Sequence, residues 1–198
     1  MAATFQYAEY DQLSGKVFKS IKNQVHSSDK ELPVPVSVKE VISEVIVLTQ
    51  SKAVKHGVEI QVEPIDEKIQ VMATEPELVQ VLTNLVSNGI DAIRDSNRKR
   101  SNTDSPANNI MSWIKIHAKE NGDDSKELSI IVADSGTGVP AELQAKIFDS
   151  LFTTKKSGEG TGLGLSISKR LVQKHGGTLS LLPNNPGAQF EVRLKKAA

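Results

Sequence analysis

The sequence has 198 residues and contains no cysteine. This absence excludes disulfide bonds, thiolate zinc sites and cysteine nucleophiles, and it fits a reducing compartment. No apolar run approaches the roughly 18 residues of a membrane-spanning helix, and the first residues lack the basic and apolar regions of a signal peptide. We therefore expect a cytoplasmic location.

The chain also has no excess of positive or negative charge, and it has few aromatic residues. Lys and Arg number 24, as do Asp and Glu, so the net charge is zero and nothing favours bulk attraction to nucleic acid. Aromatic residues make up only 4%, which argues against base-stacking surfaces. Hydrophobic residues, by contrast, reach 38%, enough to form a core and to exclude global disorder.

The first residues differ in pattern from the rest. Apolar side chains three and four positions apart predict an amphipathic helix at Tyr7–Val25. This helix either packs on the same domain or belongs to a separate helical module. Pro33-Val34-Pro35 then predicts a linker. We accordingly divide the chain into residues 1–32 and 33–198.

From Val36 onward, helical and strand patterns predict an α+β fold of two layers, with a mixed, mostly antiparallel sheet packed on helices. Ser37 and Glu40 form a capping box for the first helix. The predicted helices run from Ser37 to about His56, and over Pro76–Ser96, Ala141–Phe148 and Leu163–His175. The predicted strands form the pairs Val58–Val62 with Lys68–Met72, Ile110–Ala118 with Leu128–Ala133, and Thr178–Leu182 with Gln189–Leu194.

Three polar residues share one face of the predicted helix Pro76–Ser96. Asn84, Asn88 and Asp91 stand at positions i, i+4 and i+7, beside an apolar face. Asn is a poor residue for a helix interior because its side chain competes for backbone hydrogen bonds. The three residues form either a solvated face or a site where an amide oxygen meets a hard cation such as Mg²⁺, which keeps substrate phosphates in its shell.

A carboxylate and two glycines follow the apolar strand Leu128–Ala133, in the segment Asp134-Ser-Gly136-Thr-Gly138. An ionised carboxylate only accepts hydrogen bonds, so Asp134 at the lip of an apolar pocket would favour the exocyclic amine of adenine over the carbonyl oxygen of guanine. The alternative is an ordinary Asp-Gly turn.

A second glycine-rich segment, Gly158-Glu-Gly160-Thr-Gly162-Leu-Gly164, leads into the last predicted helix. Free N–H groups and the helix dipole suit phosphate there, although a flexible linker is the alternative. The spacing matches neither G-x-G-x-x-G nor G-x-x-x-x-G-K-[ST], which excludes a Rossmann fingerprint and a Walker A loop.

A stretch upstream of the glycines carries further candidates for contact with phosphates. Thr153, Thr154 and Lys155 are able to reach phosphate oxygens. The alternative for Lys155 and Lys156 is plain surface charge.

These segments, in this order, resemble the ATP-binding domain of the GHKL superfamily, which comprises gyrase, the heat-shock chaperone ATPase, histidine kinases and MutL. NLVSNGIDAI resembles the N box, DSGTGVP the G1 box, IFDSLFTTK the F box and GEGTGLGLSIS the G2 box. The resemblance covers about residues 36–194 and implies a Bergerat-type α/β sandwich that binds Mg-ATP.

The resemblance also implies roles for single residues. Asn88 would bind Mg²⁺, Asn84 would support the phosphates, and Lys155 would join them as a catalytic residue. Asp134 would hold the adenine amine. The other nucleotide-binding positions that the resemblance implies are Asp91, Gly136, Gly138, Thr153, Thr154, Gly160, Thr161, Gly162, Leu163 and Gly164. Gly89 departs from the family, which usually has Ala there.

Within the superfamily, the sequence most resembles histidine kinases. The gyrase, chaperone and MutL branches have a catalytic Glu at the position of Asn84, and an amide cannot act as a general base. The resemblance implies transfer of the ATP γ-phosphoryl group to a histidine on a dimerisation domain and then to a response regulator, in a parent protein that would be a homodimer. A nucleotide-sensing pseudokinase and an anti-sigma-type serine kinase are the alternatives.

None of the histidines, His26, His56, His117 and His175, is followed by an acid as in the family's H box. We therefore expect the chain to be a fragment, or to use a phosphoacceptor in trans. Residues 1–32 would then hold a remnant of the dimerisation helix and a linker. Whether the parent protein carries a membrane anchor is left open.

Overall fold

The structure is a computed structural model that describes residues 32–101, 111–120, 126–155, 160–183 and 187–197. The predicted helix Tyr7–Val25 lies outside these residues, so that helix and the division into 1–32 and 33–198 stay predictions. Among the described residues, no helix is both long and apolar enough to cross a membrane.

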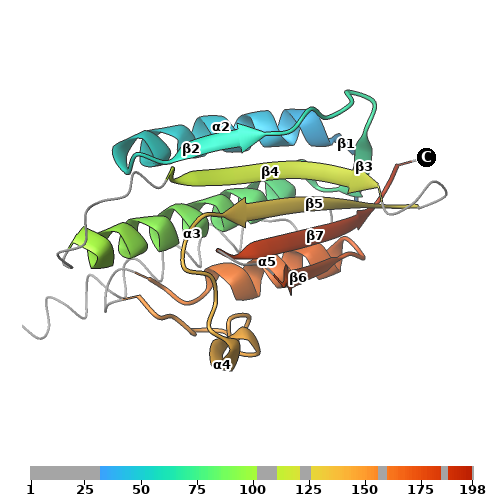
Figure 1. Ribbon diagram of the computed structural model, residues 1–198. Helices are drawn as coiled ribbons and strands as arrows, with labels where there is room; N and C mark the ends of the chain where they lie inside the picture. Colours follow the sequence, from blue (N-terminus) through green and yellow to red (C-terminus); the bar gives the residue numbers. More distant parts are fainter. Residues whose placement is uncertain (1–31, 102–110, 121–125, 156–159, 184–186, 198) are drawn as a thin grey trace, which may run out of the picture.

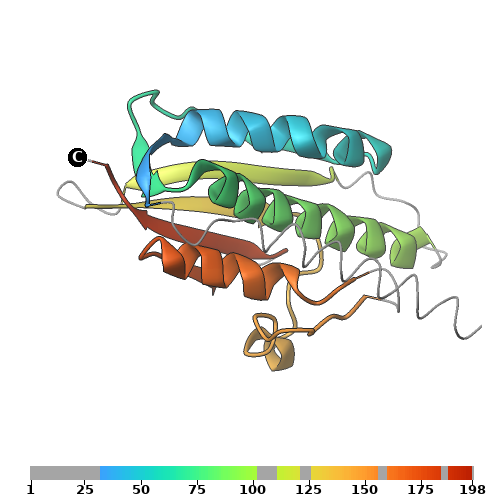
Figure 2. The same ribbon diagram turned by 180° about the vertical axis from the view of Figure 1, so that it is seen from behind.

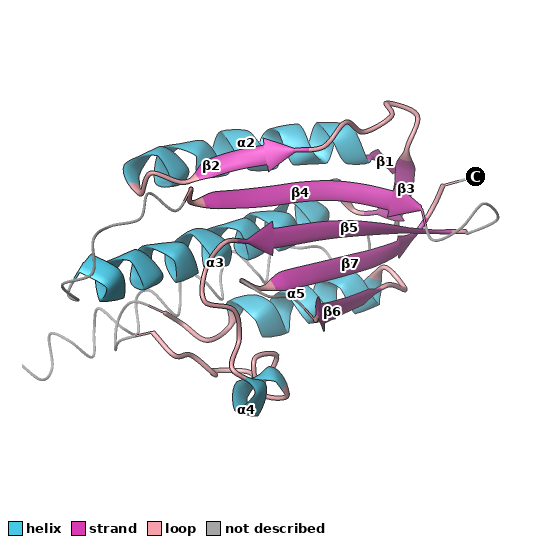
Figure 3. Cartoon of the chain, viewed as in Figure 1, coloured by secondary structure: helices cyan, strands magenta, loops and turns pink. Residues whose placement is uncertain are grey.

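The described residues form two sheets, three longer helices and one short helix (Figure 3). The helices are α2 (Val38–Lys55), α3 (Glu75–Ser101), the short α4 (Ala141–Gln144) and α5 (Gly164–Lys174). The strands are β1 (Val34–Ser37), β2 (Glu59–Val62), β3 (Gln70–Ala73), β4 (Trp113–Glu120), β5 (Glu127–Asp134), β6 (Thr178–Leu182) and β7 (Gln189–Lys195).

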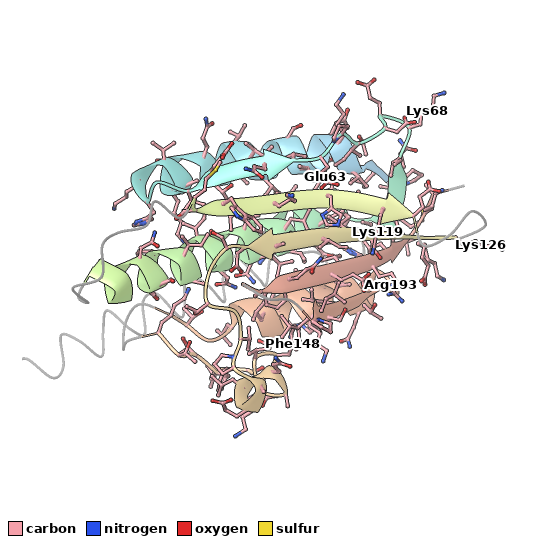
Figure 4. The ribbon with its side chains drawn as sticks, in the orientation of Figure 1. Glu63, Lys68, Lys119, Lys126, Phe148 and Arg193 are labelled. Atoms are coloured by element: carbon pink, nitrogen blue, oxygen red, sulfur yellow. The ribbon has the colours of Figure 1, made fainter. Side chains whose placement is uncertain are left out.

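The larger sheet has five strands in the order β2-β4-β5-β7-β6. Only β2 and β4 are parallel, and the other neighbours are antiparallel. Helices α2, α3 and α5 lie side by side on one face of this sheet (Figures 1 and 2). The other face carries polar side chains such as Glu63, Lys119 and Arg193 (Figure 4). The predicted two-layer α+β fold is confirmed.

The core lies between the helices and the larger sheet. Leu82 and Leu85 of α3 meet Ile114 of β4 and Ile130 of β5 in one apolar cluster, and each is at most 1% exposed. Burial of such a side chain contributes about 1.5–3 kcal/mol. Because α3 buries this apolar stripe against the sheet, its polar face lies beside the core. Asn84 and Asn88 on that face are only partly buried.

Two predictions for the strands are wrong. Pro33-Val34-Pro35 is not a linker, because residues 34–37 form β1, which pairs with β3. An edge strand tolerates Pro35, whose missing N–H group breaks no central ladder. The predicted pairing of Val58–Val62 with Lys68–Met72 does not form, since β2 pairs with β4 instead. Asp66 accepts from the N–H groups of Lys68 and Ile69 in a local turn, and beyond it β3 joins β1 in the smaller sheet.

Two helix boundaries also differ from prediction. Helix α3 continues to Ser101 instead of ending at Ser96, and Asn97 on it donates to Ser112 Oγ over 3.2 Å. Arg and Lys, which dominate the added turn, are good helix formers. The helix predicted over Ala141–Phe148 ends at Gln144. Turns follow it, and they place Ile147 in the core and Phe148 edge-on to Phe190, with ring centroids 6.3 Å apart.

A buried polar cluster joins the start of α3 to the end of α5. His175 is 5% exposed, and its Nε2 atom lies 3.2 Å from the N–H nitrogen of Thr74 and 2.9 Å from Glu77 Oε2. Lys174 Nζ lies 2.8 Å from the other oxygen of Glu77. One nitrogen cannot donate and accept at once. With its proton on Nδ1 the neutral ring accepts from the N–H group of Thr74, whereas with a proton on Nε2 it donates to Glu77.

The fold is expected to lose stability as the pH falls below about 6.5. Burial lowers the pKa of His175 from its ordinary value of 6.5, against the opposing charge of Glu77, and burial also lowers the pKa of His117 on β4. A histidine whose pKa is depressed by folding contributes stability that is present above the unfolded pKa and lost as the pH drops through the folded pKa. Urea unfolding at pH values of about 7.5 and 5.5 measures the effect across the histidine titration.

The variants His175→Gln and His117→Gln separate the two contributions. Each is expected to remove part of the pH dependence, and the double variant should remove most of it. A double variant that loses as much stability between the two pH values as the wild type would contradict this assignment.

Candidate functional site

A cavity of about 460 Å³ opens between α3, the segment after β5, and the loops on either side of residues 156–159. Its lining includes most of the residues predicted for the site, namely Asn84, Asn88, Asp91, Asp134, Gly138, Thr153, Thr154, Lys155, Gly160, Thr161, Gly162 and Gly164. Segments far apart in the sequence thus meet at one place. Gly136 and Leu163 do not line the cavity.

Asp134 forms the buried end of the cavity and is 4% exposed. Its Oδ1 atom accepts from the N–H groups of Gly136 over 2.8 Å and Ala188 over 3.3 Å. Within the described part of the chain, Oδ2 accepts no hydrogen bond from the protein and is left for a ligand. Burial raises the pKa of Asp134, and the two backbone donors oppose this. The N–H group of Gly136 therefore helps to hold the carboxylate of Asp134 in place.

Gly89 lies directly beneath this carboxylate. A Cβ atom at Gly89 would stand 2.6 Å from Ile114 Cδ1 and 3.1 Å from Asp134 Cβ. The side chain of Ile114 therefore occupies the space that the methyl group of the family's usual Ala would take. Gly89 also lines the cavity, and a Cβ atom there would lie 3.6 Å from Asp134 Oδ2.

Asn84 lies against the first turn of α5. Its Nδ2 atom donates to Ser168 Oγ over 3.0 Å, and Ser168 is 2% exposed. A Cβ atom at Gly164 would overlap Asn84 Oδ1 and lie 3.0 Å from Cγ. Glycine at position 164 thus allows α5 to begin in contact with α3. The N-terminal end of α5 therefore lies at the cavity.

Asp91 and Lys155 form a charged cluster at the open end of the cavity. Lys155 Nζ lies 2.6 Å from Asp91 Oδ2 and 3.4 Å from Asn88 Oδ1. Lys52 of α2 lies 2.9 Å from Asp91 Oδ1, and Arg94 lies 3.5 Å from the same atom. Burial alone would raise the pKa of Asp91, but Lys155 and Lys52 outweigh it and lower the pKa.

The two loops that frame residues 156–159 touch through their backbones. Gly162 has φ +67°, and a Cβ atom there would lie 2.7 Å from Leu151 Cα. Leu151 itself has φ 67°, a left-handed conformation that is uncommon outside glycine. The backbones of the F-box and G2-box segments therefore approach each other too closely at this point for any side chain at position 162.

Reasoning from the sequence missed several residues of the site. Gly187, Ala188 and Phe190 lie at the turn into β7 and reach the cavity or Asp134. Lys52 was missed because it stands on a helix with no motif. Gly187 lies between the predicted strands Thr178–Leu182 and Gln189–Leu194, and nothing local marks its contact with Asp134.

The described residues include no group of three or more His, Asp and Glu side chains that could hold a metal ion. The cavity nevertheless fits a hard cation. Asn88 Oδ1 and Asp91 Oδ2 are oxygen donors of the kind Mg²⁺ prefers, and the ammonium group of Lys155 already stands between them as a cation. A metal held by so few side chains needs further oxygens, such as phosphates.

Comparison with known proteins places the chain among related sequences. A family model described as histidine kinase-, DNA gyrase B- and HSP90-like ATPase matches residues 73–198. The chain is 33% identical over 147 residues to the two-component sensor PprA of Pseudomonas aeruginosa, an alignment that covers 73% of this chain and 14% of PprA. It is 34% identical over 161 residues to the histidine-protein kinase AtoS of Escherichia coli, covering 80% of this chain and 23% of AtoS. The chain thus spans less than a third of the curated relatives that it matches.

Solved structures show the same fold. The catalytic domain of histidine kinase ThkA is 32% identical, with a TM-score of 0.66 over 84% of this chain and 96% of that domain. Full-length ShkA in complex with AMPPNP is 25% identical, with a TM-score of 0.65 over 85% of this chain and 32% of ShkA. ThkA in complex with the response regulator TrrA aligns at 27% identity and a TM-score of 0.66 over 96% of this chain and 51% of that chain.

Proposed function

Because the chain belongs to the histidine kinase-, DNA gyrase B- and HSP90-like ATPase family, we propose that it is the ATP-binding catalytic part of a two-component sensor histidine kinase. One observation carries the proposal: four motifs far apart in sequence line one cavity, with an acceptor-only carboxylate at its buried end and a charged cluster at its open end. The choice of the kinase branch rests on Asn84, whose amide contacts Ser168 and cannot remove a proton.

The nucleotide would lie along the cavity with adenine at the buried end. Asp134 Oδ2 accepts from the exocyclic amine of adenine, and apolar side chains such as Val139 and Ile147 line the cavity beside it. The phosphates lie toward Thr153, Thr154 and Lys155, and toward Gly160, Thr161, Gly162 and the start of α5. Asn88 would hold Mg²⁺, which when bound neutralises developing charge on the phosphates.

The reaction is phosphoryl transfer to a second domain. The bond between the γ-phosphorus and the bridging oxygen of ATP breaks, ADP leaves, and a bond forms from phosphorus to a ring nitrogen of a histidine on a dimerisation domain. The proton of that imidazole goes to a group beside the histidine, since Asn84 is no base. The cavity contributes by positioning the nucleotide and stabilising charge.

The partners follow from this reaction and from the relatives. A homodimeric parent with a dimerisation domain supplies the histidine, and a response regulator receives the phosphoryl group. The similarity to ThkA, which has been solved with TrrA, supports the second partner. We place this part of the protein in the cytoplasm, where ATP is available.

Adenine nucleotides are expected to bind more tightly than guanine nucleotides. Guanine presents a carbonyl oxygen where adenine has its amine, and Asp134 can only accept. The variant Asp134→Asn should lose about 1.5–3 kcal/mol of ATP binding, the scale of a hydrogen bond to a charged group. Titration calorimetry with ATP and GTP measures both effects.

Asp149→Asn provides a matched control, because Asp149 is exposed and does not line the cavity. It should bind ATP as the wild type does. Equal affinities of the wild type for ATP and GTP would remove the adenine assignment.

A further inference from the structure

The charged cluster at the open end of the cavity holds three cations and two carboxylates, the second of which, Asp95, lies 2.8 Å from Arg94. Asp91, 8% exposed, is contacted by Lys155, Lys52 and Arg94. Lys52 also donates to the carbonyl oxygen of Ser87 over 3.0 Å, which fixes it to α3. Asp91 therefore keeps two cationic partners when Lys155 moves away. Departure of Lys155 does not leave an unpaired buried carboxylate, the situation that makes breaking a buried ion pair costly.

The three cations differ in where they stand. Lys52 and Arg94 do not line the cavity, whereas Lys155 does. Lys155 is also the only one of the three that lies within hydrogen-bond distance of Asn88. It belongs to the loop between α4 and residue 156, so its position is set by a contact with α3 and not by a helix or strand of its own.

We propose that Lys155 is a built-in cation of the nucleotide site, held beside Asn88 by Asp91 in the nucleotide-free protein and replaced there by the divalent cation when the metal–nucleotide complex binds. The inference rests on the proposed function, which supplies the nucleotide. Mg²⁺ binds oxygen at about 2.0–2.1 Å. A metal ion on Asn88 Oδ1 and an ammonium group held close to the same oxygen repel each other, so the two exchange.

A measurable consequence concerns nucleotide binding without metal. In the absence of Mg²⁺, the ammonium group of Lys155 supplies the charge that the phosphates need. In its presence, the metal supplies that charge and Lys155 becomes dispensable for binding. Removal of the ammonium group should therefore weaken ATP binding chiefly when metal is absent.

The test compares ATP affinities in EDTA and in excess Mg²⁺ for the full chain, by titration calorimetry. The variant Lys155→Met is expected to weaken binding in EDTA by about tenfold, and binding in Mg²⁺ by less than about threefold, where tenfold corresponds to about 1.4 kcal/mol. Lys155→Arg should behave as the wild type. Lys146→Met, which removes an exposed lysine outside the cavity, controls for the lost net charge. Adenosine, which has no phosphate, should bind Lys155→Met and the wild type equally.

Asp91 is a positioning residue in this proposal, and a double-mutant cycle tests it. When Lys155 is present, Asp91→Asn should change the ratio of the ATP affinity in EDTA to the ATP affinity in Mg²⁺. In the Lys155→Met background the same substitution should leave this ratio unchanged. An independent effect of Asp91→Asn in that background would contradict the positioning role.

The outcomes separate this inference from the proposed function. Equal losses with and without Mg²⁺ make Lys155 an ordinary phosphate ligand and overturn the exchange, while ATP binding itself stands. No change in either condition overturns it as well. A wild-type chain that binds no nucleotide under either condition overturns the proposed function, and this inference with it.

Discussion

Asn88→Ala is expected to abolish phosphoryl transfer from ATP to a histidine supplied in trans. Asn88 is the side chain proposed to hold Mg²⁺, and its Oδ1 atom faces the cation position that Lys155 occupies. Loss of the ligand removes the charge stabilisation that the metal gives to the transferring group. We expect at least a hundredfold loss of transfer rate, or about 2.7 kcal/mol at 1.36 kcal/mol per tenfold.

The assay mixes the chain with labelled ATP, Mg²⁺ and a second protein that carries the dimerisation hairpin and phosphoacceptor histidine of a related sensor kinase. Transfer appears as label on the second protein that is lost in acid and stable in alkali. Asn97→Ala is the control, because Asn97 lies on the same helix but outside the cavity lining. Transfer by Asn88→Ala at the rate of the control would remove Asn88 from the metal site.

The chain incubated alone with Mg-ATP is expected to remain unlabelled on histidine. His175 is buried against Glu77 and Thr74, and His56 caps the end of α2 beside Gly57. His117 lies within β4, and no histidine is followed by an acid. His26 lies outside the described residues and is followed by Ser27. Acid-labile label on the chain alone would direct attention to His26.

Local patterns were sufficient to predict most of the fold. The apolar stripe of α3, the strand before Asp134 and the glycines before α5 each carry their signal within a few turns or residues. Their meeting around one cavity was implied by the resemblance of the four motifs to one ATP-binding domain, and no local pattern predicted it.

Long-range contacts explain what the sequence did not reveal. The partner of β3 is β1, about 36 residues earlier, and the choice depends on burial of Val71 and Ala73, not on any turn signal. Lys52 likewise has no motif, and its role appears only because α2 lies beside α3 with Lys52 opposite Asp91. In both cases the deciding interaction joins residues that are distant in the sequence.

Gly187 is a further residue whose role depends on a long-range contact, and its substitution is expected to have the largest effect on stability. It has φ +88°, and its backbone lies between Asp134 and Gly138. A Cβ atom at Gly187 would overlap the carbonyl oxygen of Asp134 and lie 2.8 Å from its carbonyl carbon. The carbonyl oxygen of Gly187 would in turn stand 2.7 Å from a Cβ atom at Gly138. The turn before β7 thus packs backbone to backbone against the G1 segment.

Gly187→Ala is therefore expected to destabilise the fold by roughly 2–5 kcal/mol, the sum of about 1–2 kcal/mol for a left-handed alanine and about 1–3 kcal/mol for overpacking against an immobile backbone. Gly176→Ala is the matched control, because Gly176 has φ +72° and no atom within 4 Å of its Cβ position. The control should lose only the conformational part, about 1–2 kcal/mol.

Urea unfolding of the two variants measures the difference, and ATP titration adds a second reading if Gly187→Ala folds. Relief of the overlap must move either the turn or Asp134, and the turn also carries Ala188, whose N–H group donates to Asp134 Oδ1. A folded Gly187→Ala protein should consequently bind ATP more weakly than Gly176→Ala does. Equal stabilities and equal ATP affinities of the two variants would show that the contact between Gly187 and Asp134 positions neither the turn nor the carboxylate.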